Sequence, residues 1–488
     1  MSLADRHVNL PPDTWLRARW IWMRALGLIF FSAFYSLWFQ IHGLIGEKGI
    51  LPVPEYLGAL TQYLGGIKRF WYAPTLLWLS PTDTALTVIV TLGLIASLLL
   101  TLNVRPRLMT GIATVLFLSC IAGLQDFSSY QSDGMLLEAG FLSLFFAPRG
   151  TRPGLGAEDP LSPLSLFMLR WEWLRIYFES GIVKLASGDQ HWRNLTAMDD
   201  YYQNGPLPSW PGWYVQHLPH WYHAGTVILI FVVELLLVWA VYMPRKFRLA
   251  CFPIVTALQI GIIATANYAF LNYLVLSLGV LLVDDRAFER LGFKRVASTA
   301  VTSPTKMYTL RRRLETAVLG VALYATVAAF LFGGSFLASP AELLSPFRIA
   351  NAYGLFAVMT EARYEIEFQG SNDGRVWIAY PFRYKPQKPR DRPGFFAPYQ
   401  PRFDWNLWFA SLGPPAESPW VMRAQQRLLE GSQPVLRLFR RDPFGGKPPR
   451  MVRTVLWQYW FTDAATKRRT GEWWRRKELG PFMPVAVR

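Results

Sequence analysis

Residues 164–185 read LSLFMLRWEWLRIYFESGIVKL, and this stretch decides the fold. It is apolar enough to enter a lipid bilayer, yet it carries five ionisable side chains. Each such group costs roughly 2.5–3.5 kcal/mol at membrane depth on insertion scales, so these residues are usually paired or functional. The stretch therefore predicts a membrane helix whose charged face turns toward other helices or a water-filled cavity. The charged residues are Arg170, Glu172, Arg175, Glu179 and Lys184.

A polar, aromatic and proline-rich loop follows this helix, from Gly188 to His223. It holds four of the six histidines, His191, His217, His220 and His223. We expect the loop to lie over the outer mouth of the cavity, with its tryptophans at the level of the lipid headgroups. The histidines have neither paired cysteines nor HExxH spacing, so an interfacial aromatic belt is favoured over a metal site.

Composition indicates a membrane protein with several spans. Hydrophobic residues make up 52% of the 488 residues, and several apolar runs exceed the ~18 residues that a span needs. We predict about nine spans, of which the fourth and eighth are short. They are residues 20–40, 82–102, 107–124, 131–147, 164–185, 224–243, 249–267, 268–283 and 314–337.

Lys and Arg in the short loops predict the orientation. With the N-terminus inside, the basic loops after the second, fourth, sixth and eighth spans also fall inside. The loops 125–133 and 188–223 hold one basic residue between them, Arg193, and fall outside. An odd number of spans then places the tail outside the cytoplasm.

The chain divides into a multi-pass helical domain, residues 1–340, and a tail, residues 341–488. The tail holds 24 Lys and Arg against 13 Asp and Glu, which favours an acidic protein partner or lipid headgroups. No nucleic-acid motif accompanies this charge. Alternating apolar residues predict strands at 364–370, 376–384 and 450–461. Residues 404–411 and 420–429 are predicted as helices, the second by its amphipathic spacing. The fold class is therefore a polytopic α-helical membrane protein followed by a β-rich extracytoplasmic domain.

The tail resembles the lipase maturation factor family, and the membrane part resembles it too. The resemblance covers nearly the whole chain. It is carried by residues 351–360 (NAYGLFAVMT), 365–367 (EIE), 370–374 (GSNDG), 382–386 (FRYKP), 397–405 (APYQPRFDW), 427–432 (RLLEGS), 448–450 (PPR), 473–474 (WW), 180–185 (SGIVKL), 203–208 (QNGPLP) and 213–214 (WY).

This resemblance implies a membrane-anchored, chaperone-like maturation factor, as family members in the endoplasmic reticulum are for dimeric lipases. The chain has no cysteine outside its predicted spans and no lumenal retention signal, so it looks like a bacterial member in the inner membrane. In a eukaryote, the endoplasmic reticulum membrane would be expected. The implied partners are the bilayer and a protein client such as a lipase, with no cofactor, no metal and no nucleic acid. We expect binding to involve Arg175, His191, Trp192, Asn194, Tyr202, Trp213 and Tyr214.

A shorter motif resembles the membrane domain of vitamin K-dependent gamma-carboxylase, through Tyr177-Phe178, Ser180-Gly181, Lys184-Leu185 and Trp192. It implies the alternative function, a membrane enzyme with Lys184 as a base and Glu179 as a second catalytic group in an outward-facing cavity. Lys184 at the helix end could instead extend to the headgroups, and Arg175 and Glu179 could belong to a structural ion pair between helices. A chaperone should tolerate Lys184→Arg, whereas a lysine base should not.

Overall fold

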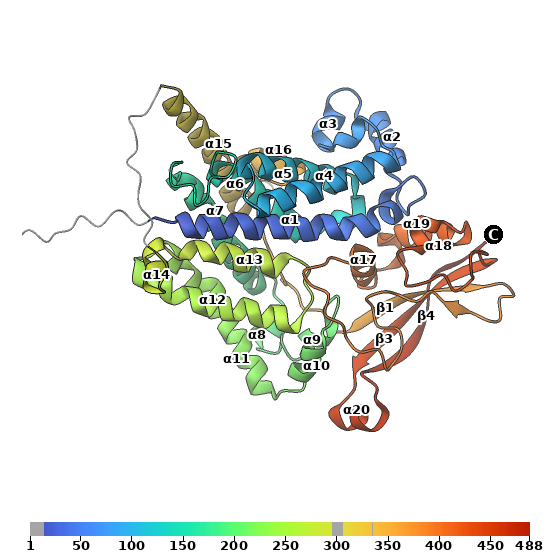
Figure 1. Ribbon diagram of the computed structural model, residues 1–488. Coiled ribbons are helices and arrows are strands. Elements are labelled where there is room, and N and C mark those ends of the chain that lie inside the picture. Colours follow the sequence, from blue (N-terminus) through green and yellow to red (C-terminus); the bar gives the residue numbers. More distant parts are fainter. Residues whose placement is uncertain (1–13, 160, 295–305, 334) are drawn as a thin grey trace, which may run out of the picture.

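The computed structural model describes residues 14–159, 161–294, 306–333 and 335–488, which form a helical bundle and a tail built on a small sheet (Figure 1). The bundle helices run side by side and alternate in direction along the chain. They are α1 (Leu16–Ile45), α4 (Asp83–Thr101), α5 (Pro106–Gly123), α6 (Gln131–Phe146), α7 (Pro163–Ala186), α11 (His220–Phe231), α12 (Arg245–Thr265), α13 (Leu271–Gly279) and α15 (Lys306–Leu331).

Short helices form the connections between these elements. α11 continues directly through a π-helical turn, η3 (Val232–Leu236), into the 3-10 segment η4 (Leu237–Tyr242). The others are α2 (Val53–Leu64), α3 (Lys68–Tyr72), η1 (Leu76–Trp78), η2 (Gln125–Ser128), α8 (Gln190–Arg193), α9 (Tyr201–Asn204), α10 (Trp210–Gln216), η5 (Val280–Leu282), α14 (Asp285–Arg290), η6 (Phe336–Ala338), α16 (Ser339–Leu344) and η7 (Ser345–Phe347).

Six helical segments among the described residues are long and apolar enough to cross a membrane: α1, α4, α5, α11 with η3 and η4, α12, and Thr309–Leu331 of α15. The predicted count of nine is not confirmed. The other three predicted spans do form helices, but α6 has 16 residues, α13 has nine, and α7 carries five ionisable side chains. These three helices depend on protein neighbours to cover their polar groups.

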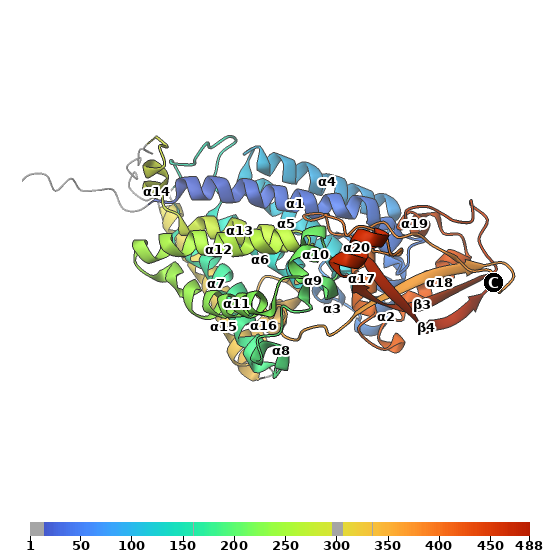
Figure 2. The same ribbon diagram turned by 90° about the horizontal axis from the view of Figure 1, so that it is seen from below.

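The start of the bundle and the tail lie at opposite ends of the molecule (Figures 1 and 2). At the end near α14, Asp285 accepts hydrogen bonds from the N–H groups of Leu16 and Arg17, which caps the first turn of α1. Arg19 donates to the carbonyl oxygens of Gly156 and Asp159 in the connection between α6 and α7. The basic segments that the sequence places on one side of the membrane therefore gather at one end of the bundle.

The tail contains a four-stranded antiparallel sheet in the order β2-β1-β3-β4. α17 packs against β1, and α18 packs against β3 and β4. The elements are β1 (Arg363–Ser371), β2 (Ile378–Ala379), α17 (Arg402–Ala410), η8 (Pro415–Glu417), α18 (Trp420–Leu429), α19 (Gln433–Leu436), β3 (Met451–Phe461), α20 (Ala464–Thr470) and β4 (Trp474–Val487).

Strands β1 and β3 and helices α17 and α18 confirm the predicted elements, whereas the strand predicted at 376–384 is much shorter than expected. Only β2 pairs there, because both N–H groups of Arg375 and Val376 bond Asp373 Oδ1 at 2.8 Å and hold a wide loop. Pro381, which lacks an N–H group, follows directly after Tyr380. The edge strand β4 was not predicted from the sequence, since its charges and its prolines obscure the alternation.

One hydrophobic core runs from the bundle into the tail. Phe127 and Tyr130, which precede α6, contact Trp420 and Trp405 of the tail with ring centroids 5.1 and 5.2 Å apart. Aromatic pairs of this kind add about 0.5–1.5 kcal/mol each beyond the area they bury. The tail is therefore packed onto the bundle.

Candidate functional site

The ionisable residues of α7 point into the bundle. Arg175 and Glu179 are each 1% exposed and Lys184 is 2% exposed. The prediction that these side chains avoid lipid is confirmed. Because an uncompensated charge in hydrocarbon is expensive, each of them needs a partner from another element.

Arg175 lies between two carboxylates. It donates to Glu138 of α6, and its Nη1 lies 4.0 Å from Glu179 Oε1. Glu138 Oε2 also accepts hydrogen bonds from the N–H and Nδ2 of Asn351, at 3.1 and 3.0 Å, and from the hydroxyl of Tyr353 at 2.7 Å. Glu179 Oε2 accepts the N–H of Tyr353 at 2.6 Å. These bonds fasten the early part of the tail, residues 351–360, which we call the linker, onto α6 and α7.

Lys184 pairs with a residue of another membrane helix. Its Nζ lies 2.9 and 2.8 Å from the two carboxylate oxygens of Glu234. Glu234 stands in the π-helical turn η3, and such turns occur frequently at functional sites. A Cβ on Gly181 would lie 2.7 Å from Leu235 Cδ2 and 3.0 Å from Glu234 Cβ, so the glycine favours the close approach of η3 to α7. Lys184 is therefore buried in an ion pair, and the interpretation that it extends to the headgroups is wrong.

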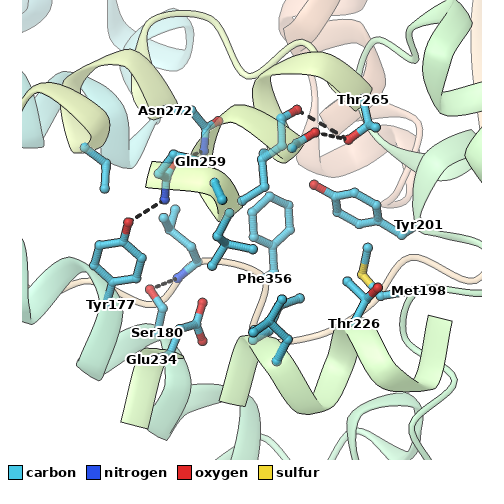
Figure 3. Close-up of a pocket in the computed structure, with 18 of the residues that line it drawn as sticks. Tyr177, Ser180, Met198, Tyr201, Thr226, Glu234, Gln259, Thr265, Asn272 and Phe356 are labelled. Atoms are coloured by element: carbon cyan, nitrogen blue, oxygen red, sulfur yellow. Dashed lines mark hydrogen bonds between the residues drawn. The ribbon is translucent and has the colours of Figure 1, made fainter. Parts of the chain in front are cut away.

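A cavity of about 580 Å³ lies beside this ion pair, between α7, η3, α11, α12 and α13 (Figure 3). Lys184 and Glu234 contribute to its wall, whereas most of the remaining lining is apolar. Trp192, Tyr201 and Tyr202 of the loop and Phe356 of the linker also line it. The loop thus lines a cavity, and two of the predicted binding residues, Trp192 and Tyr202, lie there. Its predicted place over the outer mouth stays a prediction.

The loop is joined to the linker by hydrogen bonds. The indole N–H of Trp192 donates to the carbonyl oxygen of Phe356 at 3.0 Å. Asn204 Nδ2 donates to the carbonyl oxygen of Thr360 at 2.7 Å, and Asn204 itself accepts the indole N–H of Trp408 from α17 at 3.0 Å. The cavity wall, the loop and the tail are therefore parts of one connected structure.

The other predicted binding residues lie in different places. His191 Nε2 is 3.9 Å from Glu361 Oε1, and Asn194 is exposed next to α8. Trp213 is buried, whereas Tyr214 is 52% exposed. Lys467 of α20 lies 3.7 Å from the ring centroid of Trp473, 4.6 Å from that of Trp213 and 5.0 Å from that of Tyr214. Trp213, Tyr214, Trp473 and Lys467 thus form an aromatic–basic cluster between the loop and the tail.

The histidines of the loop serve separate contacts. His217 Nε2 lies 3.0 Å from the carbonyl oxygen of Thr462, and His220 Nδ1 lies 3.0 Å from Asp199 Oδ2. His223 is buried beside Tyr202. The interfacial belt predicted for these histidines is wrong for His223, which is enclosed by protein. In the part of the chain that the structure describes, no three His, Cys, Asp or Glu side chains gather to hold a metal ion.

A buried ion pair also joins the tail to the bundle directly. Arg402 Nη1 and Nη2 each lie 2.7 Å from an oxygen of Asp133, and both side chains are fully buried. Arg402 Nη1 donates in addition to the carbonyl oxygen of Phe127 at 2.8 Å. A two-point pair of this geometry is strong and fixes orientation.

Asp404 is a fully buried carboxyl group of the tail, and its pKa is raised. Burial raises the pKa of Asp404 in α17 to about 7, although nearby Lys385 and two long backbone hydrogen bonds act in the opposite direction. In the unfolded chain this group titrates near pH ~3.9. The folded protein therefore binds a proton that the unfolded chain has lost between about pH 4 and 7.

We expect the free energy of unfolding to fall as pH rises through this window and to level off above about pH 7. The contribution of Asp404 is at most about 4 kcal/mol, since each pKa unit corresponds to about 1.4 kcal/mol. Asp404→Asn should flatten the dependence of Tm on pH between 5 and 7.5 for the purified chain. Glu430→Gln, at a residue whose side chain is 58% exposed, should leave the profile unchanged. An Asp404→Asn profile as steep as that of the parent chain would contradict this assignment.

The sequence did not identify the residues that pair with the buried charges. Glu138, Glu234, Asp133 and Arg402 complete the buried pairs, and Asn351 and Tyr353 connect them to the linker. A usable signal was present for two of them. Glu234 is the only acidic residue of the predicted span 224–243. Glu138 is the only acidic residue that follows Asp133 in the predicted span 131–147.

Comparison with known families gives matches over both parts of the chain. The model described as "Lipase maturation factor transmembrane domain" matches residues 17–290. The model described as "Lipase maturation factor C-terminal domain" matches residues 349–484. Neither is a gamma-carboxylase model, so that weaker resemblance gains no support.

Curated relatives match over nearly full length. The chain is 31% identical to "Lipase maturation factor 2" of Gallus gallus, over 96% of this chain and 81% of the relative. It is 29% identical to "Lipase maturation factor 1" of Bos taurus, over 100% and 92%. It is 30% identical to "Lipase maturation factor 1" of Homo sapiens, over 99% and 90%. No solved structure gives a significant match.

Proposed function

Because this chain belongs to the lipase maturation factor family, we propose that it is a membrane-embedded maturation factor that assists the folding or assembly of lipases. The names of the relatives support a lipase client, and the alignments include both the bundle and the tail. The chain is a multi-pass membrane protein by its six apolar helices.

The observation that carries the proposal is the rigid attachment of the tail to the bundle. The pair between Arg402 and Asp133 and the bonds from Glu138 to the linker are buried. Buried charged groups bound at two points hold one geometry. A membrane part built in this way presents the tail and the loop to a client in a fixed orientation, which suits an assembly factor.

We place the client surface on the loop and on the neighbouring α20. Large aromatic side chains are exposed there, among them Trp210 at 39%, Tyr214 at 52% and Trp221 at 74%. Lys467, Arg468 and Arg469 add positive charge in α20. Aromatic residues with adjacent basic groups are typical of protein interfaces, where a few of them supply most of the binding energy. Binding by such a surface is non-covalent and needs no cofactor.

We also propose that this surface lies outside the cytoplasm, because the basic loops gather at the opposite end of the bundle. The inner membrane of a bacterium, or the endoplasmic reticulum in a eukaryote, would provide this orientation. Both carboxylate oxygens of Glu234 accept hydrogen bonds from Lys184, which supports a structural role for this lysine. No observation favours the enzyme alternative.

Co-expression with a secreted dimeric lipase tests the function in cells that lack their own maturation factor. We expect the full chain to raise the lipase activity per lipase molecule in the medium. Replacing Trp210, Tyr214 and Trp221 together by alanine should reduce this gain about tenfold or more, because hot-spot residues contribute about 2 kcal/mol or more each.

Tyr63→Ala is the matched control, since Tyr63 is 86% exposed on α2, away from the loop (Figure 1). It should leave the gain intact. If the unaltered chain gives no gain, the proposed function is wrong. If the gain survives the triple replacement, the surface is wrong and the function stands.

A further inference from the structure

The cavity beside Lys184 opens toward the lipid-facing side of the bundle. Leu229 of α11 and Ile254 of α12 line it and are each 43% exposed. Ala257 and Gly261, one and two turns further along α12, line it and are exposed as well. Both helices belong to segments that are long and apolar enough to cross a membrane. A molecule dissolved in the bilayer can therefore reach this opening without entering water.

The opposite wall of the cavity is polar and buried. Gln259 and Asn272 are 4% and 6% exposed. Gln259 Nε2 donates to the hydroxyl of Tyr177 at 2.8 Å, and Asn272 Nδ2 donates to Gln259 Oε1 at 2.8 Å (Figure 3). Among the described residues, the Tyr177 hydroxyl accepts the bond from Gln259 and donates none. This hydroxyl can therefore donate to an oxygen atom of a bound molecule.

The wall carries no net charge. Among the residues that the structure describes, the only Lys, Arg, Asp or Glu side chains that line the cavity are those of Lys184 and Glu234, and they neutralise each other at 2.8 Å. An anionic or cationic head group would need a counter-charge that this wall does not offer. The cavity thus suits a molecule with an apolar body and a neutral, oxygen-bearing head.

We propose that this cavity binds one neutral single-chain lipid whose hydroxyl- or ester-bearing head bonds Tyr177, Gln259 and Asn272. Its volume of about 580 Å³ lies within the usual range of about 300–1,000 Å³ for small-molecule sites. The hydrocarbon chain extends past Ala257 and Gly261 toward the bilayer. This inference does not depend on the client of the protein.

The bound lipid would also contact the linker. Leu355 and Phe356 line the cavity, and the N–H of Leu355 bonds Ser180 Oγ of α7 at 3.1 Å. Phe356 has a left-handed backbone, with φ of 56°, and Trp192 bonds its carbonyl oxygen. A ligand that packs against this segment binds the folded state only, so it raises Tm, and the increase grows with the logarithm of ligand concentration above Kd.

Photolabelling of the full chain in detergent tests the site. The probe is a photoactivatable, alkyne-bearing monoacylglycerol, with unlabelled monoolein as competitor and peptide mapping as readout. We expect the label on α7, α12 or the linker, and competition by monoolein. Gly261→Phe should reduce labelling at least tenfold, because a Cβ at Gly261 meets no atom within 4 Å and the ring can fill the opening.

Gly320→Phe on α15 is the matched control. A Cβ there also meets no atom within 4 Å, and Gly320 does not line the cavity. Labelling should persist in this variant, and monoolein should raise the Tm of the control but not that of Gly261→Phe. Gln259→Leu should weaken labelling by the monoacylglycerol more than labelling by an alkane probe with the same reactive group.

Three results would overturn the proposal. The first is a label that maps outside these elements. The second is equal labelling of Gly261→Phe and Gly320→Phe. The third is a fatty-acid probe that labels the cavity as strongly at neutral pH as the monoacylglycerol does, since a carboxylate head is charged and the wall offers it no counter-charge.

Discussion

Arg402→Met should destabilise the protein by about 3–5 kcal/mol, because it leaves Asp133 buried without its counter-charge. Both side chains are fully buried, and the two bonds of 2.7 Å between them connect α17 of the tail to α6 of the bundle. We expect a lower Tm in detergent, faster proteolysis between bundle and tail, and a several-fold lower abundance in membranes.

Two variants serve as controls for this result. Arg423→Met breaks an exposed pair with Glu55, whose side chains are 48% and 53% exposed, and it should cost at most about 1 kcal/mol. The double replacement of Arg402 by Met and Asp133 by Leu removes both charges and should recover much of the lost stability. If Arg402→Met behaves like Arg423→Met, the pair does not hold the tail.

Lys184→Met should have an effect of similar size, again about 3–5 kcal/mol, because Glu234 then remains charged inside the bundle. The bonds lost are those of 2.9 and 2.8 Å between Lys184 Nζ and the Glu234 carboxylate. Membrane abundance and Tm should fall together. Lipase activity per molecule of remaining protein should change little, since the pair supports the structure.

Lys184→Arg keeps the charge and should retain most of the abundance, although the larger guanidinium must fit beside Trp192. The double replacement of Lys184 by Met and Glu234 by Gln should be less damaging than Lys184→Met alone, because no unpaired charge is left. Normal abundance of Lys184→Met together with complete loss of client activity would contradict the structural role. That outcome would favour a lysine base.

Much of the fold could be predicted from periodicity and charge. Helices occupy all nine predicted spans, but within the described ranges only six are apolar and long enough to cross a membrane alone. The difference lies in α6, α7 and α13. A hydropathy average over one segment contains no information on the protein neighbours that cover its charges or on where its helix ends. In the tail, β3 and α18 follow their apolar spacing, whereas the edge strand β4 has few buried positions to reveal it.

The candidate site was predictable only in part. The sequence marks Arg175, Glu179 and Lys184, because an ionisable group in an apolar run needs a reason to be there. It gives no means of assigning partners, since Glu138 lies on another helix and Asn351 follows more than a hundred residues later. The interpretation of Arg175 and Glu179 as part of a structural ion pair between helices is supported, since Arg175 bonds Glu138 of α6 and its Nη1 lies 4.0 Å from Glu179 Oε1.

The sequence by itself determined that this protein is a multi-pass membrane protein with a folded tail and a charged central helix. Those properties depend on local composition. The bilayer sets the free-energy cost of each polar or charged residue in a membrane helix, whatever its neighbours in the fold. Only the tertiary structure decided which charges meet, that the linker is fastened to α6 and α7, and that a cavity remains beside Lys184. Ion pairs and cavities are properties of surfaces brought together from distant segments. The distance between Lys184 and Glu234 follows from the packing of η3 against Gly181, which no local pattern specifies.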